Sequence, residues 1–380
     1  MTNLNPFEVD QTPAFVLEYD KFLNNLAVIE DIQKRVPVRF LLALKGFAMH
    51  SVFGEIAKVA SGATASSLNE ALLAAEFFPE VHVYAPAYRP LEFDSIVSLS
   101  THITCNSLHE YERYKHKLGK VLTGLRINPE YSVVSTELYN PCANGSRLGI
   151  TASELPCLPD GITGLHVHNL CENGAEELAG TLTQIERLYD HLFGEITWLN
   201  LGGGHLVTRS TYDRALLQQT LVDFHQRYPH IQLIMEPGAA YVWETGVLVA
   251  TVLDVVENHN IVTAILDTSF AAHMGDCLEM PYTPRVRGAK IHSLETEAGD
   301  GYLVRLGGSS CLAGDWVGPY VFDKRPTVGT RIVFEDMMHY TMVKTNMFNG
   351  IALADIGIWR DDQYTVVRRF SYSDYRNRLS

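Results

Sequence analysis

Lys45 is the residue of this sequence whose surroundings most clearly suit a role in catalysis. It follows the apolar run Leu-Leu-Ala-Leu at positions 41–44. Such a run is typical of a strand buried on both faces. Lys45 would then lie at the end of the strand, with its amine projecting from apolar surroundings. Burial disfavours the charged form of an amine, so the pKa of Lys45 would fall and the amine would become a nucleophile. The alternative is a lysine that ends a strand and simply extends into solvent.

Three further groups of residues follow later β-like runs. His166 and His168 are two positions apart, so on a strand both side chains point to the same side. Glycines occupy positions 202–204, and Glu236 is followed by Pro-Gly. A triple glycine allows backbone N–H groups to enclose an anion, although a tight turn uses the same residues.

The histidine pair could also form half of a metal site, which keeps a metal-dependent hydrolase open as an alternative. Such a site needs further ligands on neighbouring strand ends, and only Glu236 is suitably placed, so we expect no metal. A lysine, a histidine, an anion cradle and a carboxylate at one site would instead suit pyridoxal phosphate. Lys45 would bind the cofactor covalently, His168 would stack on its ring, and Glu236 would keep its pyridine nitrogen protonated. His166 is expected to be a buried, hydrogen-bonded core histidine.

The positions of these groups follow from an alternation of strands and helices. Eight β-like runs, each followed by a plausible helix, occur in about 200 residues, which predicts a (β/α)8 TIM-like barrel over residues 30–240. In such barrels the carboxyl ends of the strands carry the active site, and Lys45, His168, the glycines and Glu236 all fall there. A doubly wound open sheet is the alternative. Besides the run before Lys45, the expected strands are 62–65, 81–84, 102–105, 121–128, 164–168, 197–201 and 231–236, and the clearest helices are 67–77, 108–117, 176–192 and 212–228.

After Glu236 the pattern changes to short β-rich runs separated by glycine, proline or aspartate. We expect a C-terminal antiparallel β-barrel domain, formed by residues 241–380 together with residues 1–29 and their strand at 14–18. This β-rich domain is expected to contribute to the substrate site and to a dimer interface. Its other expected strands are 247–257, 261–267, 289–294, 302–306, 331–335 and 364–368.

Composition limits the classes of partner and the cellular setting. The 380 residues are 46% hydrophobic and 19% charged, with a net charge of −14, which argues against nucleic acid and anionic membranes and suits a cationic ligand. The six cysteines are scattered without a C-x-x-C pair, as is typical of reduced thiols. The first residues lack the basic start and apolar core of a signal peptide, and no apolar run reaches the ~20 residues of a membrane span. These features predict a cytoplasmic protein.

The motifs resemble a known family. Residues 42–45, 164–168, 199–204 and 236–238 match, in order and spacing, the fold-type III pyridoxal-phosphate decarboxylases, which include the ornithine, arginine and diaminopimelate enzymes. The resemblance covers essentially the whole chain. Within this group the sequence is most similar to the carboxynorspermidine (carboxyspermidine) decarboxylases, through residues 168–172, 269–282, 311–315 and 347–350.

The resemblance implies a role for each cofactor-binding residue. Lys45 would carry pyridoxal 5'-phosphate and His168 would stack on the ring. The phosphate would be bound by Gly203, Gly204 and Gly238, with help from Tyr340.

The resemblance also implies a shared active site in a homodimer. Cys311 would reach the neighbouring subunit's site and protonate the α-carbon after carbon dioxide leaves. Asp315 would face the distal amine of a small, cationic, carboxylated polyamine. Asp276 and Glu279 would hold the polyamine chain near Glu236. The reaction implied is the release of norspermidine or spermidine and carbon dioxide in polyamine biosynthesis.

Two departures from the group affect the expected specificity. The diaminopimelate and ornithine enzymes usually have Gly-Ser where this chain has Leu170-Cys171, and an arginine where it has Ala239. The missing arginine removes one expected phosphate contact and argues against a substrate with a carboxylate tail. An amino-acid racemase or a pyridoxal-phosphate carrier on a similar barrel stays open, but a racemase typically sets an arginine, not Glu236, against the pyridine nitrogen.

Overall fold

The chain folds into two compact units. The computed structural model describes residues 4–134, 140–279, 281–292 and 301–380. One unit is Asn25–Tyr241, and the other combines Met1–Asn24 with Val242–Ser380. Among the described residues, no helix is both long and apolar enough to cross a membrane.

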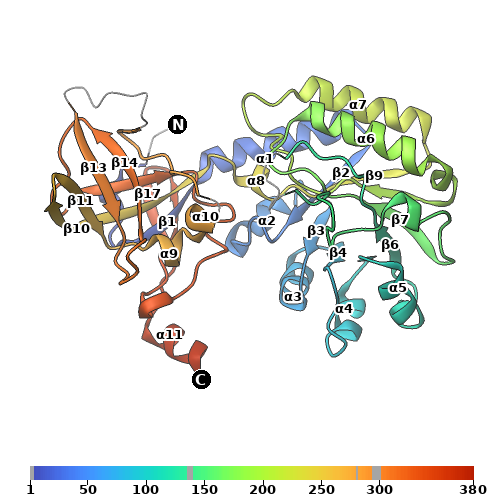
Figure 1. The fold of residues 1–380 in the computed structure, drawn as a ribbon, viewed down its shortest axis with the longest axis horizontal. Coiled ribbons are helices and arrows are strands. Elements are labelled where there is room, and N and C mark those ends of the chain that lie inside the picture. The colour runs from blue at the N-terminus through green and yellow to red at the C-terminus, as the bar shows by residue number, and fades with distance from the viewer. Residues whose placement is uncertain (1–3, 135–139, 280, 293–300) are drawn as a thin grey trace. The chain divides into compact units, whose positions relative to one another are not determined.

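The unit Asn25–Tyr241 is built on a closed barrel of eight parallel strands in sequence order, with helices on its outside (Figure 1). This confirms the predicted (β/α)8 architecture. The strands are β2 (Val38–Ala43), β3 (Gly62–Ala65), β4 (Val81–Tyr84), β5 (His102–Cys105), β6 (Leu122–Arg126), β7 (Ile162–His166), β8 (Trp198–Asn200) and β9 (Gln232–Met235). The helices are α1 (Tyr19–Arg35, which begins in the other unit), α2 (Phe53–Ile56), α3 (Leu68–Phe77), α4 (Phe93–Leu99), α5 (Leu108–Tyr114), α6 (Ala175–Tyr189), α7 (Arg214–Arg227) and α8 (Ala239–Val242).

Capping side chains determine where three of the barrel helices begin. Ser67, Ser107 and Asp213 precede α3, α5 and α7, and each side-chain oxygen accepts a hydrogen bond from the backbone N–H three positions on. Such caps satisfy N–H groups that have no partner inside the helix. They fix where each strand-to-helix loop ends, and these loops carry the site.

A large aromatic ring occupies part of the barrel interior. Trp198 packs with Leu41 and Ile234. A Cβ atom on Gly164 would lie 2.0 Å from the Trp198 ring, and one on Gly124 would lie 2.3 Å from it. Glycine is therefore required at both positions, because no other residue leaves room for the indole inside the barrel.

The second unit contains one nine-stranded sheet with a largely antiparallel pairing (Figure 1). Two pairs, β1 with β16 and β11 with β13, run parallel, which makes the sheet mixed where an antiparallel one was expected. The strands are β1 (Ala14–Glu18), β10 (Gly246–Asn258), β11 (Ile261–Leu266), β12 (Ala289–Ile291), β13 (Tyr302–Gly307), β14 (Trp316–Phe322), β15 (Arg331–Glu335), β16 (Asp355–Arg360) and β17 (Gln363–Arg368), with helices α9 (Phe270–His273), α10 (Gly275–Glu279) and α11 (Tyr372–Leu379).

Two strands of this sheet, β14 and β16, are absent from the prediction. β14 contains Gly318 and Pro319, which predict a turn, but they lie where its pairing with β13 shifts register. β16 contains Gly357, at which a Cβ atom would lie 2.2 Å from the ring of Tyr364 on β17. Part of the predicted strand 289–294 lies outside the described residues.

Candidate active site

Four loops meet at the carboxyl ends of the barrel strands. Lys45 lies two residues after β2, and a Cβ atom on the adjacent Gly46 would lie 3.0 Å from Cα of Gly238, after β9. His168 lies two residues after β7, and its Nδ1 accepts a hydrogen bond from the N–H of Gly203, after β8, at 3.0 Å. The barrel therefore brings together the lysine, the histidine and both glycine loops that the sequence predicts.

Lys45 and His168 contact each other directly. Lys45 Nζ lies 3.1 Å from His168 Nε2. The lysine is exposed to solvent at the mouth, yet protein atoms surround it closely enough for desolvation to lower its pKa. Desolvation lowers the pKa of His168 well below its usual value, and a charge on Lys45 would lower it further, so the ring is neutral at physiological pH.

Glycine is required in the loop after β8 because the backbone lies against neighbouring loops. Gly202 has φ = 67°, and a Cβ atom there would lie 2.5 Å from the carbonyl oxygen of Val167. A Cβ atom on Gly203 would lie 2.5 Å from the carbonyl oxygen of Glu236. Gly204 has φ = 84°. The N–H of Gly202 donates to Asn200 Oδ1 and that of Gly203 to His168 Nδ1, so Gly204 is the glycine of this loop that would offer its N–H to an anion.

Glu236 is a buried carboxylate, 8% exposed, directly after β9. Its Oε1 accepts a hydrogen bond from Asn200 Nδ2 at 2.6 Å, and Asn200 Oδ1 in turn accepts from the N–H of Gly202 at 2.9 Å. His166 Nε2 lies 3.7 Å from Glu236 Oε2, and burial lowers the pKa of His166 to about 4. His166 is 2% exposed, which agrees with the expected burial, but neither ring nitrogen has a hydrogen-bond partner among the described residues, where a hydrogen-bonded histidine was expected. The neutral amide of Asn200 thus fixes the orientation of the Glu236 carboxylate.

The sequence reasoning missed Arg126, which ends β6 at the same mouth. Its guanidinium donates hydrogen bonds to the carbonyl oxygen of His168 at 2.8 Å and to the hydroxyl of Tyr84 at 2.7 Å. Arg126 thereby fixes the backbone from which His168 projects. A signal was available, because Arg126 is the one charged residue in the expected strand 121–128.

Glu70 was also missed, although it interacts electrostatically with Lys45. It lies in the first turn of α3, and its Oε2 accepts a hydrogen bond from the N–H of Ser66 at 2.6 Å. In sequence this residue has the spacing of a helix cap, so nothing distinguishes it from a purely structural glutamate.

In the sheet unit, Asp276 in α10 has a distinctive environment. Its Oδ2 accepts hydrogen bonds from Thr341 Oγ1 at 2.8 Å and from the Tyr282 hydroxyl at 3.1 Å. Its Oδ1 is buried and has no hydrogen-bond partner among the described residues. A buried carboxylate oxygen without a donor is costly, and a cationic ligand group would satisfy it.

The structure also describes two other predicted residues of the sheet unit. Glu279 forms an ion pair with Lys344. Tyr340, next to Thr341, is partly exposed and has φ = 32°.

Cys311 and Asp315 belong to one loop of the sheet unit. The Cys311 side chain is exposed, and its backbone N–H donates to Asn349 Oδ1 at 3.0 Å. Asp315 is 4% exposed, and its carboxylate accepts from the N–H groups of Ala271 at 3.0 Å and Ser310 at 3.1 Å. These bonds connect the loop to the start of α9, so Asp315 fixes the loop that presents Cys311.

A cluster that could suit a metal ion among the described residues lies at the other end of the barrel. Glu80, His82 and His102 have ligand atoms within 4.8 Å of one another, at the amino ends of β4 and β5. Arg39 already pairs with Glu80, and the two imidazole rings stack at 3.8 Å. Within the described ranges, the mouth histidines form no such group with carboxylates. A lysine-anchored cofactor therefore suits the mouth better than a metal does.

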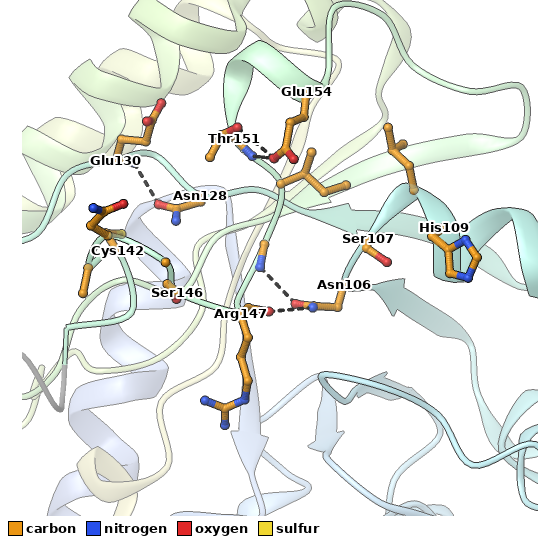
Figure 2. A pocket seen from close by; sticks show the side chains of 16 residues that line it. Asn106, Ser107, His109, Asn128, Glu130, Cys142, Ser146, Arg147, Thr151 and Glu154 are labelled. Carbon is orange, nitrogen blue, oxygen red and sulfur yellow. Dashed lines mark hydrogen bonds between the residues drawn. The ribbon is translucent and has the colours of Figure 1, made fainter.

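A cavity of about 660 Å³ lies beside the mouth, between the loops that follow β5 and β6 (Figure 2). Its lining includes Asn106, Asn128 and Arg147, but neither Lys45 nor His168. Asn106 connects its wall to the site, because Asn106 Oδ1 accepts from the same Tyr84 hydroxyl that Arg126 contacts. The chemistry of the mouth, rather than this cavity, identifies the site.

Alignments with similar proteins cover nearly the full length of this chain. Residues 19–338 match a family model described as pyridoxal-dependent decarboxylase, C-terminal sheet domain. Carboxyaminopropylagmatine decarboxylase of Synechocystis sp. is 52% identical over 97% of this chain and 95% of its own length. Carboxynorspermidine/carboxyspermidine decarboxylase of Campylobacter jejuni is 40% identical over 97% of this chain and 98% of its own.

The fold agrees with these sequence matches. The crystal structure of carboxynorspermidine decarboxylase from Campylobacter jejuni, complexed with norspermidine, superposes with a TM-score of 0.90 at 38% identity. The match covers 97% of this chain and 100% of that one. The family resemblance seen in the sequence is thereby confirmed, and the chain belongs to the pyridoxal-dependent ornithine/diaminopimelate/arginine decarboxylase family.

Proposed function

We propose that this chain removes carbon dioxide from the amino-acid end of a carboxylated polyamine, with pyridoxal 5'-phosphate attached to Lys45. The observation that carries the proposal is the convergence of Lys45, His168, Gly203 and Glu236 at one barrel mouth. Lys45 supplies an amine, His168 a flat ring and Glu236 a buried carboxylate, and the loop of Gly203 would offer the N–H of Gly204. Membership of a pyridoxal-dependent decarboxylase family supports the same cofactor.

The chain's own residues position the reaction. When bound, pyridoxal phosphate supplies an electron sink for the electrons released as the Cα–carboxylate bond breaks. Glu236, held by Asn200, would accept a hydrogen bond from the protonated ring nitrogen and so favour the electron-accepting form. Of the three predicted phosphate-binding glycines, Gly203 donates its N–H to His168 Nδ1, so Gly204 and Gly238 would donate backbone N–H groups to the phosphate.

For the substrate, we propose carboxynorspermidine or carboxyspermidine. Their far ends are ammonium groups, and the buried, partnerless Oδ1 of Asp276 suits such a cation. Glu279, which is exposed in the same helix, would extend this acidic surface along the polyamine chain, whereas Asp315 is buried and its carboxylate fixes the loop of Cys311. The Campylobacter jejuni relative carries both substrate names.

A second candidate substrate is carboxyaminopropylagmatine. The Synechocystis relative named for it is 52% identical, against 40% for the Campylobacter relative. Agmatine ends in a guanidinium, which is also a cation that carboxylates such as Asp276 can bind. This candidate therefore differs from the first in the shape of the distal cation, not in its charge.

The experiment is a comparison of kcat/KM for the three carboxylated polyamines, ornithine and diaminopimelate. We expect at least one carboxylated polyamine to exceed both amino acids by about 10²-fold or more, because the amino acids lack the cation at the far end of a long chain. A higher kcat/KM for carboxyaminopropylagmatine would favour the second candidate. Preference for diaminopimelate or ornithine would contradict the proposal.

Replacing Asp276 should reveal the contact with the distal cation. We expect Asp276→Asn to raise KM for the preferred polyamine by roughly 10-fold to 100-fold, because a charge-assisted hydrogen bond of about 1.5–3 kcal/mol is lost. Steady-state kinetics measure the change. The exposed Asp362→Asn serves as the matched control, and an unchanged KM in Asp276→Asn would exclude the contact.

We also propose that two chains form a homodimer in which each contributes to both sites. Cys311 would return the proton to the α-carbon, and its exposed thiol, on a loop fixed by Asp315, supports a role at a surface shared with a second copy. Analytical ultracentrifugation tests the assembly, since a monomer under assay conditions would contradict a shared site.

A further inference from the structure

We propose that His168 has a role before the cofactor is attached: with its tautomer set by the Gly203 amide, it holds Lys45 as an uncharged amine. This inference rests on the proposed function, in which Lys45 is the attachment point. His168 acts here as a hydrogen-bond donor through its ring edge, which is distinct from stacking through its face.

The tautomer of His168 follows from one hydrogen bond. A backbone N–H can only donate, and the N–H of Gly203 points to His168 Nδ1 at 3.0 Å. Nδ1 therefore carries a lone pair and no proton. Because the ring is neutral, its single proton lies on Nε2. The Gly203 amide is fixed in turn, since the glycine packs against the carbonyl oxygen of Glu236.

The state of Lys45 follows from the tautomer. Nε2 faces Lys45 Nζ at 3.1 Å, and with a proton on Nε2 the lysine nitrogen must accept. Only an uncharged amine has a lone pair to accept with. An ammonium could use this contact only if Nε2 also lost its proton, which would make His168 an imidazolate. Protonation of Lys45 thus breaks the contact with His168.

Several charged groups around Lys45 act on the same equilibrium. Glu236, after β9, and Glu70, in α3, favour the ammonium. An ionised Cys171, in the loop after β7, would act in the same direction, but burial raises the pKa of this thiol and keeps it neutral. Arg126, at the end of β6, disfavours it. Desolvation is the largest influence and lowers the pKa of Lys45, so the free amine persists to lower pH than in an ordinary lysine. The hydrogen bond from His168 acts in the same direction.

A free amine is what covalent attachment requires. The Lys45 nitrogen forms a bond to the aldehyde carbon of the cofactor, and the carbonyl oxygen leaves as water with the two amine protons. An ammonium has no electron pair with which to form this bond. Holding Lys45 uncharged therefore prepares the chain for loading at physiological pH.

The test measures Lys45 in the full chain after hydroxylamine has removed the cofactor. Competitive acetylation with acetic anhydride across a pH series, read by peptide mass spectrometry, gives the apparent pKa of Lys45. We expect His168→Phe, which keeps a ring of similar size but loses the N–H donor, to raise this pKa. At a fixed pH below it, Lys45 should become about threefold to tenfold less reactive. The exposed Lys324 is the internal reference and should not change.

Glu236→Gln provides a matched variant with the opposite sign. It removes a negative charge that favours the ammonium, so the apparent pKa of Lys45 should fall and its reactivity should rise. A Lys45 pKa that is unchanged or lowered in His168→Phe would overturn the inference. This readout is independent of the proposed function, which fails instead if the chain neither binds pyridoxal phosphate nor releases carbon dioxide.

The His168 tautomer can also be measured in the unaltered chain, which tests the inference even if His168→Phe does not fold. The ¹⁵N chemical shifts of histidine separate protonated from unprotonated ring nitrogens. We expect Nε2 of His168 to be protonated and Nδ1 to be unprotonated at pH 7 in the cofactor-free chain. A proton on Nδ1 would overturn the inference directly.

Discussion

Lys45→Ala is expected to lower turnover of the preferred polyamine by at least about 10³-fold, because the variant lacks the amine that anchors the cofactor. The lysine also positions that cofactor beside His168, 3.1 Å away, so its removal affects both attachment and orientation. Steady-state release of carbon dioxide measures the loss. The visible absorbance of the bound cofactor should shift or disappear in the same variant.

A matched control separates this effect from general loss of a lysine. Lys120 is exposed in a loop before β6, so Lys120→Ala should keep turnover within about twofold of the unaltered chain. If Lys45→Ala retains more than about a tenth of the turnover, the lysine is not the anchor and the account of the mouth is wrong.

The second large effect is expected at Glu236. Glu236→Gln keeps the shape of the side chain and an oxygen for Asn200 but removes the charge that would hold the pyridine nitrogen protonated. We expect kcat to fall by about 10²–10³-fold, since the charge acts on electrons that appear only in the transition state. KM should change little. Steady-state kinetics separate these two parameters.

Glu112→Gln is the corresponding control, because Glu112 is a half-exposed residue of α5 that pairs with Lys115. Its kcat should remain within about twofold of the unaltered chain. A Glu236→Gln variant with near-normal kcat would contradict the proposed role of Glu236 at the ring nitrogen.

The barrel could be predicted because its strands carry local signals. β3, β4 and β5 lie between polar or glycine-containing turns, and their observed bounds are those expected from the sequence. β14 and β16 could not be predicted in this way. Their glycines and proline argue against a strand locally. In the folded sheet, Gly318 and Pro319 lie at a register shift of β14, and Gly357 of β16 leaves room for the ring of Tyr364.

The site could be predicted to a similar extent. Lys45, His168 and the glycine loop are recognisable because each follows a strand and has a distinctive residue type. The interactions of Arg126 with the His168 carbonyl and of Asn200 with Glu236 could not be predicted, since they depend on how adjacent strands align. The free oxygen of Asp276 is likewise a property of the folded sheet unit, not of its sequence.

The central claim is that pyridoxal phosphate is covalently bound to Lys45. Borohydride reduction of the purified chain makes such a bond permanent, and digestion followed by mass spectrometry locates it. We expect the visible band to be bleached and the peptide containing Lys45 to gain the mass of the reduced cofactor. A modified peptide that does not contain Lys45, or no modified peptide in a chain that releases carbon dioxide, would contradict it.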